Sequence, residues 1–409
     1  MLRATALRVP ATALLLSLAS LPSVAATPSS GGTAGTGWVR PEHDSLSPVF
    51  GLRRVIRLSE PVGFLNIHPE QWAQPFIGND GSLVYVATDG GLLAALWINS
   101  GKLVFKRTDL GQLGASMAQV GDVLLVGSDA DLHGLEGYSG KEQWKTELGG
   151  TVGGPITVTG TIAIVPVRPS GYVALNGLTG EIRWRQKRGK AEGISVRGTA
   201  GASVDAKNKR VFTGAGDGSV SALSLDTGEV LWTTKLSSGK SDEPFPDVDT
   251  RPLLADQGRV LLAASYNGGL AGLDPKTGAV LYKKPEILHL TGLTEVKGSA
   301  WVVASLGDGQ AIGLDPRDGR VRWRYKLKKG GVPNWPVPLE HGLVAIPSLS
   351  GPVAILDAST GRPMQLINPG SGISAMPFVR GKDLALWTNK GHLVLLRLGE
   401  GTSVTAVDP

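Results

Sequence analysis

Cysteine is absent from all 409 residues of the chain. Its absence excludes disulfide bonds, thiolate nucleophiles, zinc or iron–sulfur sites held by cysteine, covalent c-type haem and a cysteine-linked lipid anchor. Charged residues make up only 19% of the chain and hydrophobic residues 41%, which is typical of a folded globular protein rather than a disordered polyelectrolyte. The sequence also contains no HExxH, no P-loop and no G-x-S-x-G elbow, so it carries none of these three catalytic signatures.

Long apolar runs are absent as well, apart from a short one near the N-terminus. Arg3 and Arg8 flank the start of an apolar run over residues 11–21, and small residues follow at 23–26. This order predicts a secretory signal peptide over residues 1–26, too short to be a stable membrane span. Its removal takes away two arginines and no acids, so the formal charge falls from +6 to +4. We therefore expect an exported, soluble protein.

Glycine is abundant, with 57 copies, and much of it belongs to one recurring phrase. Clear copies are LNGLTGEIRW (Leu175–Trp184), LSLDTGEVLW (Leu223–Trp232), LDPKTGAVLY (Leu273–Tyr282) and LDPRDGRVRW (Leu314–Trp323). Aligned on the shared glycine, seven copies fall at Gly101, Gly140, Gly180, Gly228, Gly278, Gly319 and Gly361. A period near 40 residues, in units whose short runs alternate between apolar and polar residues as strands do, is typical of propeller blades.

Each position of the phrase has a physical role. Leucine, five residues before the glycine, ends a strand on its buried face, and Asp/Asn-x-x-x-Gly forms a tight turn in which glycine takes a positive φ. An aromatic residue follows four positions after the glycine, and we expect these rings to pack between neighbouring blades. The ring positions are Phe105, Trp144, Trp184, Trp232, Tyr282 and Trp323. Gln365 breaks the pattern in the seventh copy.

Seven phrases predict seven blades, and the two ends of the chain supply an eighth. Three strands are expected after the last phrase, at 373–379, 383–388 and 392–398, and an isolated strand is expected at 52–58. The sequence thus predicts an all-β fold: an eight-bladed β-propeller of four-stranded blades, closed by pairing an N-terminal strand with the C-terminal blade. The expected segments are a signal peptide (1–26), a flexible leader (27–50), a single propeller (51–400) and a C-terminal tail (401–409).

The repeat resembles the quinoprotein-type (PQQ-like) propeller repeat, and two of its spacings are long. The extra residues fall at 189–198, before blade four, and at 237–250, before blade five. Loops longer than a repeat needs commonly carry function. The segments that surround them are similar to the BamB family, the accessory subunit of the outer-membrane β-barrel assembly complex. They are Ile194–Gly198, GDGSVSAL at Gly216–Leu223, Asp247-Val248-Asp249-Thr250 with Pro252, Tyr266-Asn267-Gly268 and Leu273-Asp274.

This resemblance implies a partner and a contact site. In the BamB family the two long loops lie together and contact BamA, the barrel insertase, through its POTRA domains. Carried over by position, the contact residues are Ile194, Val196, Arg197, Asp247 and Asp249. Apolar side chains with an arginine suit an interface centre, and the aspartates can accept hydrogen bonds from the partner or from Arg197. The alternative is that these aspartates only stabilise turns at the channel mouth.

The resemblance also implies a location, with one departure. Members of the family are typically anchored by a lipidated N-terminal cysteine, which this chain lacks. We expect a monomer within a complex, located in the periplasm and associated with the outer membrane through its partner. The resemblance also implies nascent outer-membrane proteins as clients. We expect no nucleic-acid partner, because the basic residues alternate along outer strands without a base-stacking motif.

Two other classes share the repeat. One is a different exported propeller that binds envelope components or polysaccharide; the other is a quinone-dependent oxidoreductase, whose usual vicinal cysteine pair is missing here. We expect no enzyme activity, no catalytic residues, no cofactor and no metal. The histidines show no metal-binding spacing and are expected to be surface or packing residues. They are His43, His68, His133, His289, His341 and His392.

Overall fold

The computed structural model describes most of the predicted propeller. The described residues are 49–58, 73–88, 90–169, 171–187, 200–236, 247–248, 250–327 and 331–399, apart from the side chains of residues 114 and 115. Within them the regular secondary structure consists of β-strands and two short 3-10 turns, η1 (Asp256–Gly258) and η3 (Glu340–Gly342). In this described part, no helix is long and apolar enough to cross a membrane.

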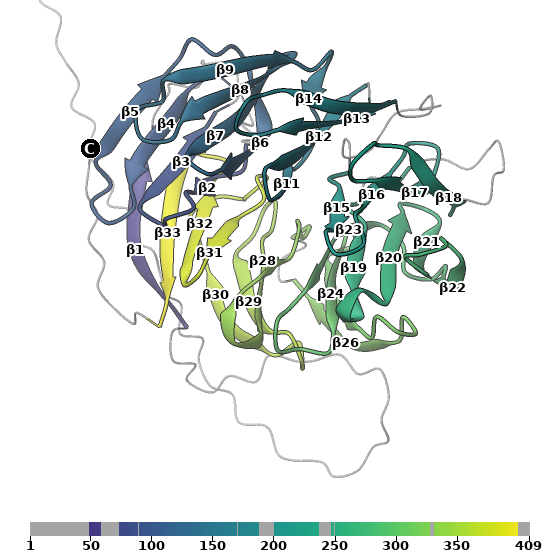
Figure 1. Ribbon diagram of the computed structural model, residues 1–409. Helices are drawn as coiled ribbons and strands as arrows, with labels where there is room; N and C mark the ends of the chain where they lie inside the picture. Colours follow the sequence, from purple (N-terminus) through teal and green to yellow (C-terminus); the bar gives the residue numbers. More distant parts are fainter. Residues whose placement is uncertain are drawn as a thin grey trace, which may run out of the picture.

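The strands form eight sheets arranged as the blades of a propeller, which confirms the predicted fold class (Figure 1). Blade one comprises β2 (Phe76–Ile77), β3 (Leu83–Ala87), β4 (Leu93–Trp97) and β5 (Leu103–Arg107), and blade two comprises β6 (Leu113–Val120), β7 (Val123–Ser128), β8 (Asp131–Glu136) and β9 (Glu142–Glu147). Blade three comprises β10 (Thr151–Val152), β11 (Thr157–Thr159), β12 (Ile162–Arg168), β13 (Gly171–Asn176) and β14 (Ile182–Lys187). Blade four comprises β15 (Ser203–Asp205), β16 (Arg210–Gly214), β17 (Ser219–Ser224) and β18 (Val230–Lys235).

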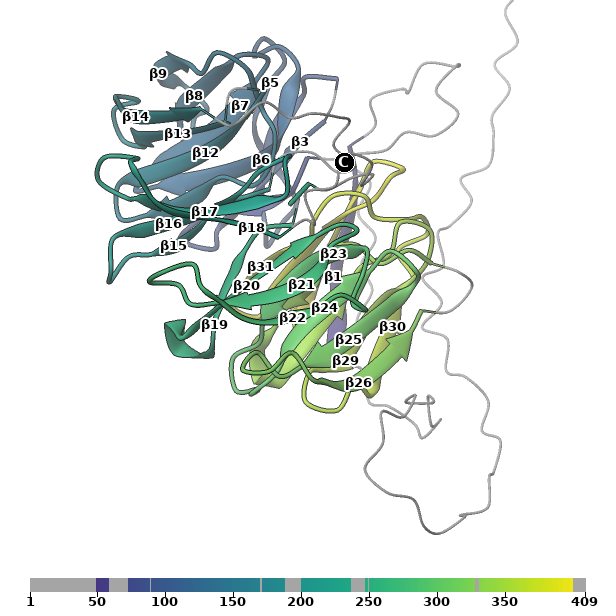
Figure 2. The ribbon, with the colours of Figure 1, turned by 90° about the vertical axis from the view of Figure 1, so that its right-hand side faces the viewer.

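The other half of the ring follows the same plan, and Figure 2 shows blade five from the side. Blade five comprises β19 (Leu253–Ala255), β20 (Val260–Ser265), β21 (Gly269–Leu273) and β22 (Val280–Lys284). Blade six comprises β23 (Leu290–Glu295), β24 (Val302–Leu306), β25 (Gln310–Leu314) and β26 (Val321–Lys326). Blade seven comprises β27 (Val337–Pro338), β28 (Leu343–Ile346), β29 (Val353–Asp357) and β30 (Pro363–Ile367). Blade eight comprises β31 (Phe378–Arg380), β32 (Asp383–Trp387), β33 (His392–Leu398) and β1 (Phe50–Arg57).

Strand β1 closes the ring, as the sequence predicts. It pairs antiparallel with β33, from Phe50 opposite Leu398 to Arg57 opposite His392, and Figure 1 shows the purple strand lying against the yellow one. Each blade therefore has four strands on its main path, although blade three carries an additional short strand, β11. Closure leaves no first or last blade with an open face.

The recurring phrase behaves as predicted in every blade that contains it. All seven leucines are buried, with exposures from 0 to 2%, and all seven glycines have positive φ, from 68° to 76°. In blade five the Asp274 side chain accepts a hydrogen bond from the backbone N of Lys276 at 2.6 Å, and the N of Gly278 donates to the Asp274 carbonyl at 2.8 Å. The acidic residue and the glycine thus form the turn between the third and fourth strands together.

The aromatic side chains pack between blades, which confirms their predicted role. The Trp184 ring of blade three is 6% exposed and lies beneath the blade-four turn, where its indole N–H donates to the Leu225 carbonyl at 2.9 Å. Gly228 lies directly over this ring: a Cβ built on it would approach Trp184 Cδ2 to 2.6 Å. Each ring therefore fixes the turn of the next blade, and only glycine leaves room for it.

Asp315, in the blade-six turn, is a buried carboxylate bonded to two arginines. Its Oδ2 accepts from Nη2 of Arg317 at 2.7 Å and from Nη2 of Arg322 at 3.2 Å, and the residue is 2% exposed. The hydrogen bond from the Arg317 side chain, opposed by burial, holds the pKa of Asp315 well below its usual value. Charged partners favour the ionised form, so this carboxylate stabilises the folded state when it is deprotonated.

We expect Asp315→Asn to lower the free energy of unfolding by about 1–2 kcal/mol near neutral pH. Because the folded pKa is lowered, the wild-type contribution is complete above the unfolded pKa of about 4 and is lost as the pH falls below it. Urea unfolding at about pH 7 and about pH 3 should show this difference shrinking in acid. Asp318→Asn, at an exposed position of the same turn, is the control. A difference that persists undiminished in acid would contradict the assignment.

Candidate interaction sites

Of the five predicted partner contacts, only Asp247 lies in the described part of the chain. Ile194, Val196, Arg197 and Asp249 fall outside the described residues, so their role stays a prediction. The strands that lead into the two long segments are described: β14 ends at Lys187 and β18 ends at Lys235. Both are fourth strands of adjacent antiparallel blades, so both segments leave from the same end of the propeller.

Asp247 and Val248 are inserted between blades four and five. Val248 is fully buried in one apolar cluster with Phe212 of blade four and Leu261 of blade five. Its backbone N donates to the Ala215 carbonyl at 2.9 Å, and the N of Tyr266 donates to the Asp247 carbonyl at 3.2 Å. These two residues of the second long segment are therefore bonded to both blades.

This insertion is part of a series of backbone bonds that continues into blade six. The N of His289 donates to the Tyr266 carbonyl at 2.9 Å, and the two rings lie 4.9 Å apart. The N of Gly307 donates to the His289 carbonyl at 2.8 Å, and Thr250 Oγ1 donates to the Leu290 carbonyl at 3.2 Å. One end of blades four to six is thus joined by backbone and side-chain hydrogen bonds, at the end of the propeller where β14 and β18 finish.

The Asp247 residue itself is only 3% exposed. Its bond with Tyr266 is made by the backbone carbonyl, so it does not distinguish partner contact from turn stabilisation by the side chain. A position that holds the segment in place can also orient neighbouring residues toward a partner, so the two roles do not exclude each other. The contact assigned to Asp247 stays a prediction.

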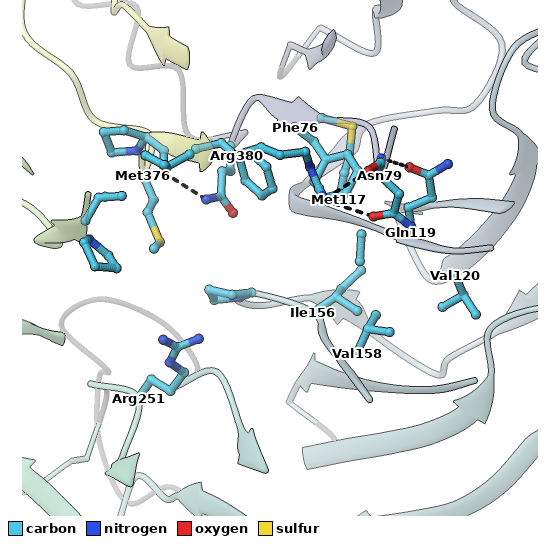
Figure 3. A pocket seen from close by; sticks show the side chains of 18 of the residues that line it. Phe76, Asn79, Met117, Gln119, Val120, Ile156, Val158, Arg251, Met376 and Arg380 are labelled. Carbon is cyan, nitrogen blue, oxygen red and sulfur yellow. Dashed lines mark hydrogen bonds between the residues drawn. The ribbon is translucent and has the colours of Figure 1, made fainter. Parts of the chain in front are cut away.

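A second feature is a cavity of about 600 Å³ in the channel that the inner strands surround (Figure 3). Six blades contribute to its wall, and much of the lining is apolar. The larger apolar side chains are Phe76, Met117, Ile156, Val158, Met376 and Phe378. Two arginines, Arg251 and Arg380, also line the cavity, and none of its described lining residues is a carboxylate. The channel therefore combines an apolar wall with net positive charge.

Arg380, on β31, connects the closing blade to blade one. Its Nε donates to the Ile77 carbonyl at 3.0 Å, and its two terminal nitrogens reach Asn79 O and Oδ1 at 3.3 and 3.1 Å. The guanidinium carbon also lies 6.0 Å from the Phe76 ring centroid and 5.8 Å from that of Phe378. A guanidinium has five N–H donors and three are used here, so Arg380 keeps two for a ligand or water.

One polar cluster in blade two has the connectivity of a catalytic triad. His133 bonds Ser128 Oγ through Nε2 at 2.7 Å and Glu142 Oε2 through Nδ1 at 2.6 Å. A nucleophile must reach its substrate, but Ser128 is 3% exposed and His133 4%. The cluster therefore connects three adjacent strands, in line with the packing role predicted for His133. Across the described residues, no group of three or more acidic or histidine side chains is placed to hold a metal ion.

Sequence reasoning did not single out Arg251 or Arg380. A weak signal exists: each is a long cation next to or within an inner strand whose neighbours are small or apolar. The alternation of apolar and polar residues along a strand does not identify the side chains that line the channel. Both faces of a blade strand are buried against neighbouring blades, so the pattern does not single out the side that faces the channel. The facing partners come from blades far apart in sequence and become visible only in the structure.

Repeated four-stranded blades, rings stacked under glycine turns and a composite closing blade define an eight-bladed β-propeller of the PQQ-like repeat class. The match to a family model is more specific. The model described as outer membrane protein assembly factor BamB matches residues 107–325 and 307–406. The chain belongs to this family.

Individual relatives agree with this assignment. The chain is similar to outer membrane protein assembly factor BamB of Burkholderia pseudomallei, with 28% identity over 76% of this chain and 81% of the relative. A BamB of Shewanella oneidensis is 24% identical over 67% of this chain and 69% of its own.

Solved structures share the fold. BamB from Moraxella catarrhalis matches with a TM-score of 0.70 and 22% identity, covering 86% of this chain and 100% of that one. A quinohemoprotein alcohol dehydrogenase from Pseudomonas putida also matches, with a TM-score of 0.67 and 15% identity, over 88% of this chain and 77% of that one. At these identities the matches concern the fold alone, which enzymes and assembly factors have in common.

Proposed function

We propose that the protein is a non-enzymatic scaffold subunit of the machinery that assembles β-barrel proteins in the outer membrane. In this role it binds the POTRA region of the barrel insertase and aids assembly of nascent outer-membrane proteins. The observation that carries the proposal is the match of the assembly-factor family model to residues 107–325 and 307–406. The proposed location is the periplasm, with association to the outer membrane through the partner.

The rigid end of blades four to six supports this proposal. Asp247 and Val248 are hydrogen-bonded to both adjacent blades, and Val248 is completely buried. A rigid base lowers the entropy lost when the residues it carries bind a partner. The proposed contacts are Ile194 and Val196 as the apolar centre, Arg197 as a planar donor, and Asp247 and Asp249 as acceptors. This function consists of binding and positioning, without covalent chemistry.

We expect the double variant Arg197→Ala with Asp249→Ala to weaken capture of the purified POTRA region by about tenfold or more, because interface arginines are frequent hot spots. Titration with immobilised POTRA domains measures the affinity, and thermal unfolding checks that the variant remains folded. The matched control is Asp318→Ala with Arg320→Ala, an exposed acid and arginine in the blade-six phrase turn, at the other end of the blades.

The outcomes separate the two interpretations of the Asp-Val-Asp-Thr segment. Weakened capture by a folded variant, with an unchanged control, supports partner contact. Unchanged capture contradicts the proposed contact site. Loss of folding in the double variant favours the alternative that these residues stabilise turns.

A further inference from the structure

Arg251 is a cation inside the channel without a bonded partner in the described part of the chain. It comes directly after Thr250, and its stem passes Gly201 of blade four, where a Cβ would lie 3.4 Å from Arg251 Cδ. Among the described residues, no oxygen is hydrogen-bonded to its guanidinium and no carboxylate pairs with it. Burial alone lowers its pKa, yet an arginine stays protonated at any physiological pH.

The stem of Arg251 is packed against protein, whereas its guanidinium is open to the channel. Its side chain is half-buried, and Figure 3 shows the guanidinium pointing into the open space of the cavity. Protein surrounds the stem while the channel gives water access to the head group. Five N–H donors are therefore directed at the cavity rather than at another part of the protein.

The described lining of the cavity contains two cations and no acid, although Asp80, outside the lining, interacts favourably with Arg380 and raises its pKa against the effect of burial. Arg380 enters from blade eight, and Figure 3 shows it on the other side of the open space from Arg251. The bonds of Arg380 go to neutral oxygens of Ile77 and Asn79. Two cations thus line one open cavity whose described lining contains no acid. Such a site attracts an anion, and low-dielectric walls strengthen the attraction.

The size and wall of the cavity restrict the anion further. A volume of about 600 Å³ is within the range of small-molecule sites, about 300–1,000 Å³. Met117 and Ile156 lie on one side of the open space, and Met376 lies on another (Figure 3). Methionine side chains adapt to varied apolar shapes. A simple inorganic ion would leave most of this apolar wall uncovered.

We propose that the channel is a binding site for a small amphipathic organic anion. Its carboxylate or sulfonate group bonds the guanidinium of Arg251, with Arg380 contributing long-range attraction and its two remaining donors. Its apolar body covers Met117, Ile156 and Met376. The site is separate from the proposed partner contacts and does not depend on them.

The test uses 8-anilinonaphthalene-1-sulfonate as the probe and its neutral counterpart N-phenyl-1-naphthylamine, which has the same rings without the sulfonate. Fluorescence titration of the full chain measures both affinities. Arg251→Met removes the charge and keeps an apolar stem, and Arg251→Lys keeps the charge without the planar fork. Arg259→Met is the matched control, because Arg259 is an exposed arginine of blade five, paired with Asp256.

We expect saturable binding of the sulfonate by the wild type, weakened about tenfold or more by Arg251→Met and less by Arg251→Lys. The neutral probe should be insensitive to these changes, and Arg259→Met should bind as the wild type does. Loss of an unpaired, partly buried charge is not expected to destabilise the fold, which thermal unfolding checks. Absence of saturable sulfonate binding, equal affinity in Arg251→Met, or an equal loss in Arg259→Met would overturn the proposal.

Discussion

Gly228→Ala is expected to lower the free energy of unfolding by about 3–5 kcal/mol, because it combines a strained backbone with a steric clash. The residue has φ +76°, and a Cβ would lie 2.6 Å from Trp184 Cδ2. Trp184 has little freedom to move away, since it is 6% exposed and its indole is bonded to the Leu225 carbonyl. Urea unfolding of the full chain measures the loss.

Gly298→Ala is the matched control for this prediction. Gly298 has a similar φ of +81°, but nothing lies within 4 Å of the position its Cβ would occupy. Its substitution adds the backbone strain without the clash and is expected to cost about 1–2 kcal/mol. Equal losses at the two positions would show that the contact between ring and turn does not hold adjacent blades together.

Gln365→Leu is expected to lower the free energy of unfolding by about 2–4 kcal/mol, because it leaves two buried backbone groups without partners. Gln365 Oε1 accepts from the Phe50 N at 2.7 Å, and its Nε2 donates to the Phe50 carbonyl at 3.0 Å. Leucine has a similar volume, so the loss reports the hydrogen bonds rather than a cavity. Both bonds hold β1, the strand that closes the ring.

The control for Gln365 is Gln310→Leu. Gln310 lies on β25 and bonds the exposed Asp308 side chain, so its replacement should cost less than about 0.5 kcal/mol. Limited proteolysis of both variants tests the cause, because release of β1 should expose the chain near Phe50 in Gln365→Leu alone. A loss no larger than that of the control would contradict the assigned role.

The fold is predictable from the sequence to an unusual degree because seven of the eight blades repeat the same local phrase between their third and fourth strands. Leucine, acidic residue, glycine and aromatic ring each occupy a position with a single physical role, and their period gives the number of blades. The departures are harder to interpret. Gln365 breaks the ring pattern in the sequence, whereas in the structure it binds the backbone of Phe50, 315 positions away.

The closing blade also departs from the repeat in a way that the local sequence does not predict. Arg54 of β1 takes the place beneath the Gly101 turn that a ring takes elsewhere, with its Cδ 2.7 Å from the position of a Cβ on Gly101. Its Nη2 donates to the Asn99 carbonyl at 2.7 Å. No local pattern connects these residues, since the closing contacts join opposite ends of the chain.

The interaction sites are predictable in part. The excess length before blades four and five marks candidate segments, because a repeat has a natural length from which an insertion stands out. Val248 illustrates what length cannot show: it is completely buried between two blades. Arg251 was missed for a related reason, since one arginine in a sequence does not reveal that the described residues around it include no paired acid.

The central claim, binding to the POTRA region of a barrel insertase, is tested most directly by crosslinking in cells from position 197. A photoreactive residue placed there, with the same residue at exposed position 320 as the control, is followed by identification of the captured protein. The account predicts that position 197 captures the insertase through its POTRA domains and that position 320 does not. Recovery of no POTRA domain from position 197 would contradict it.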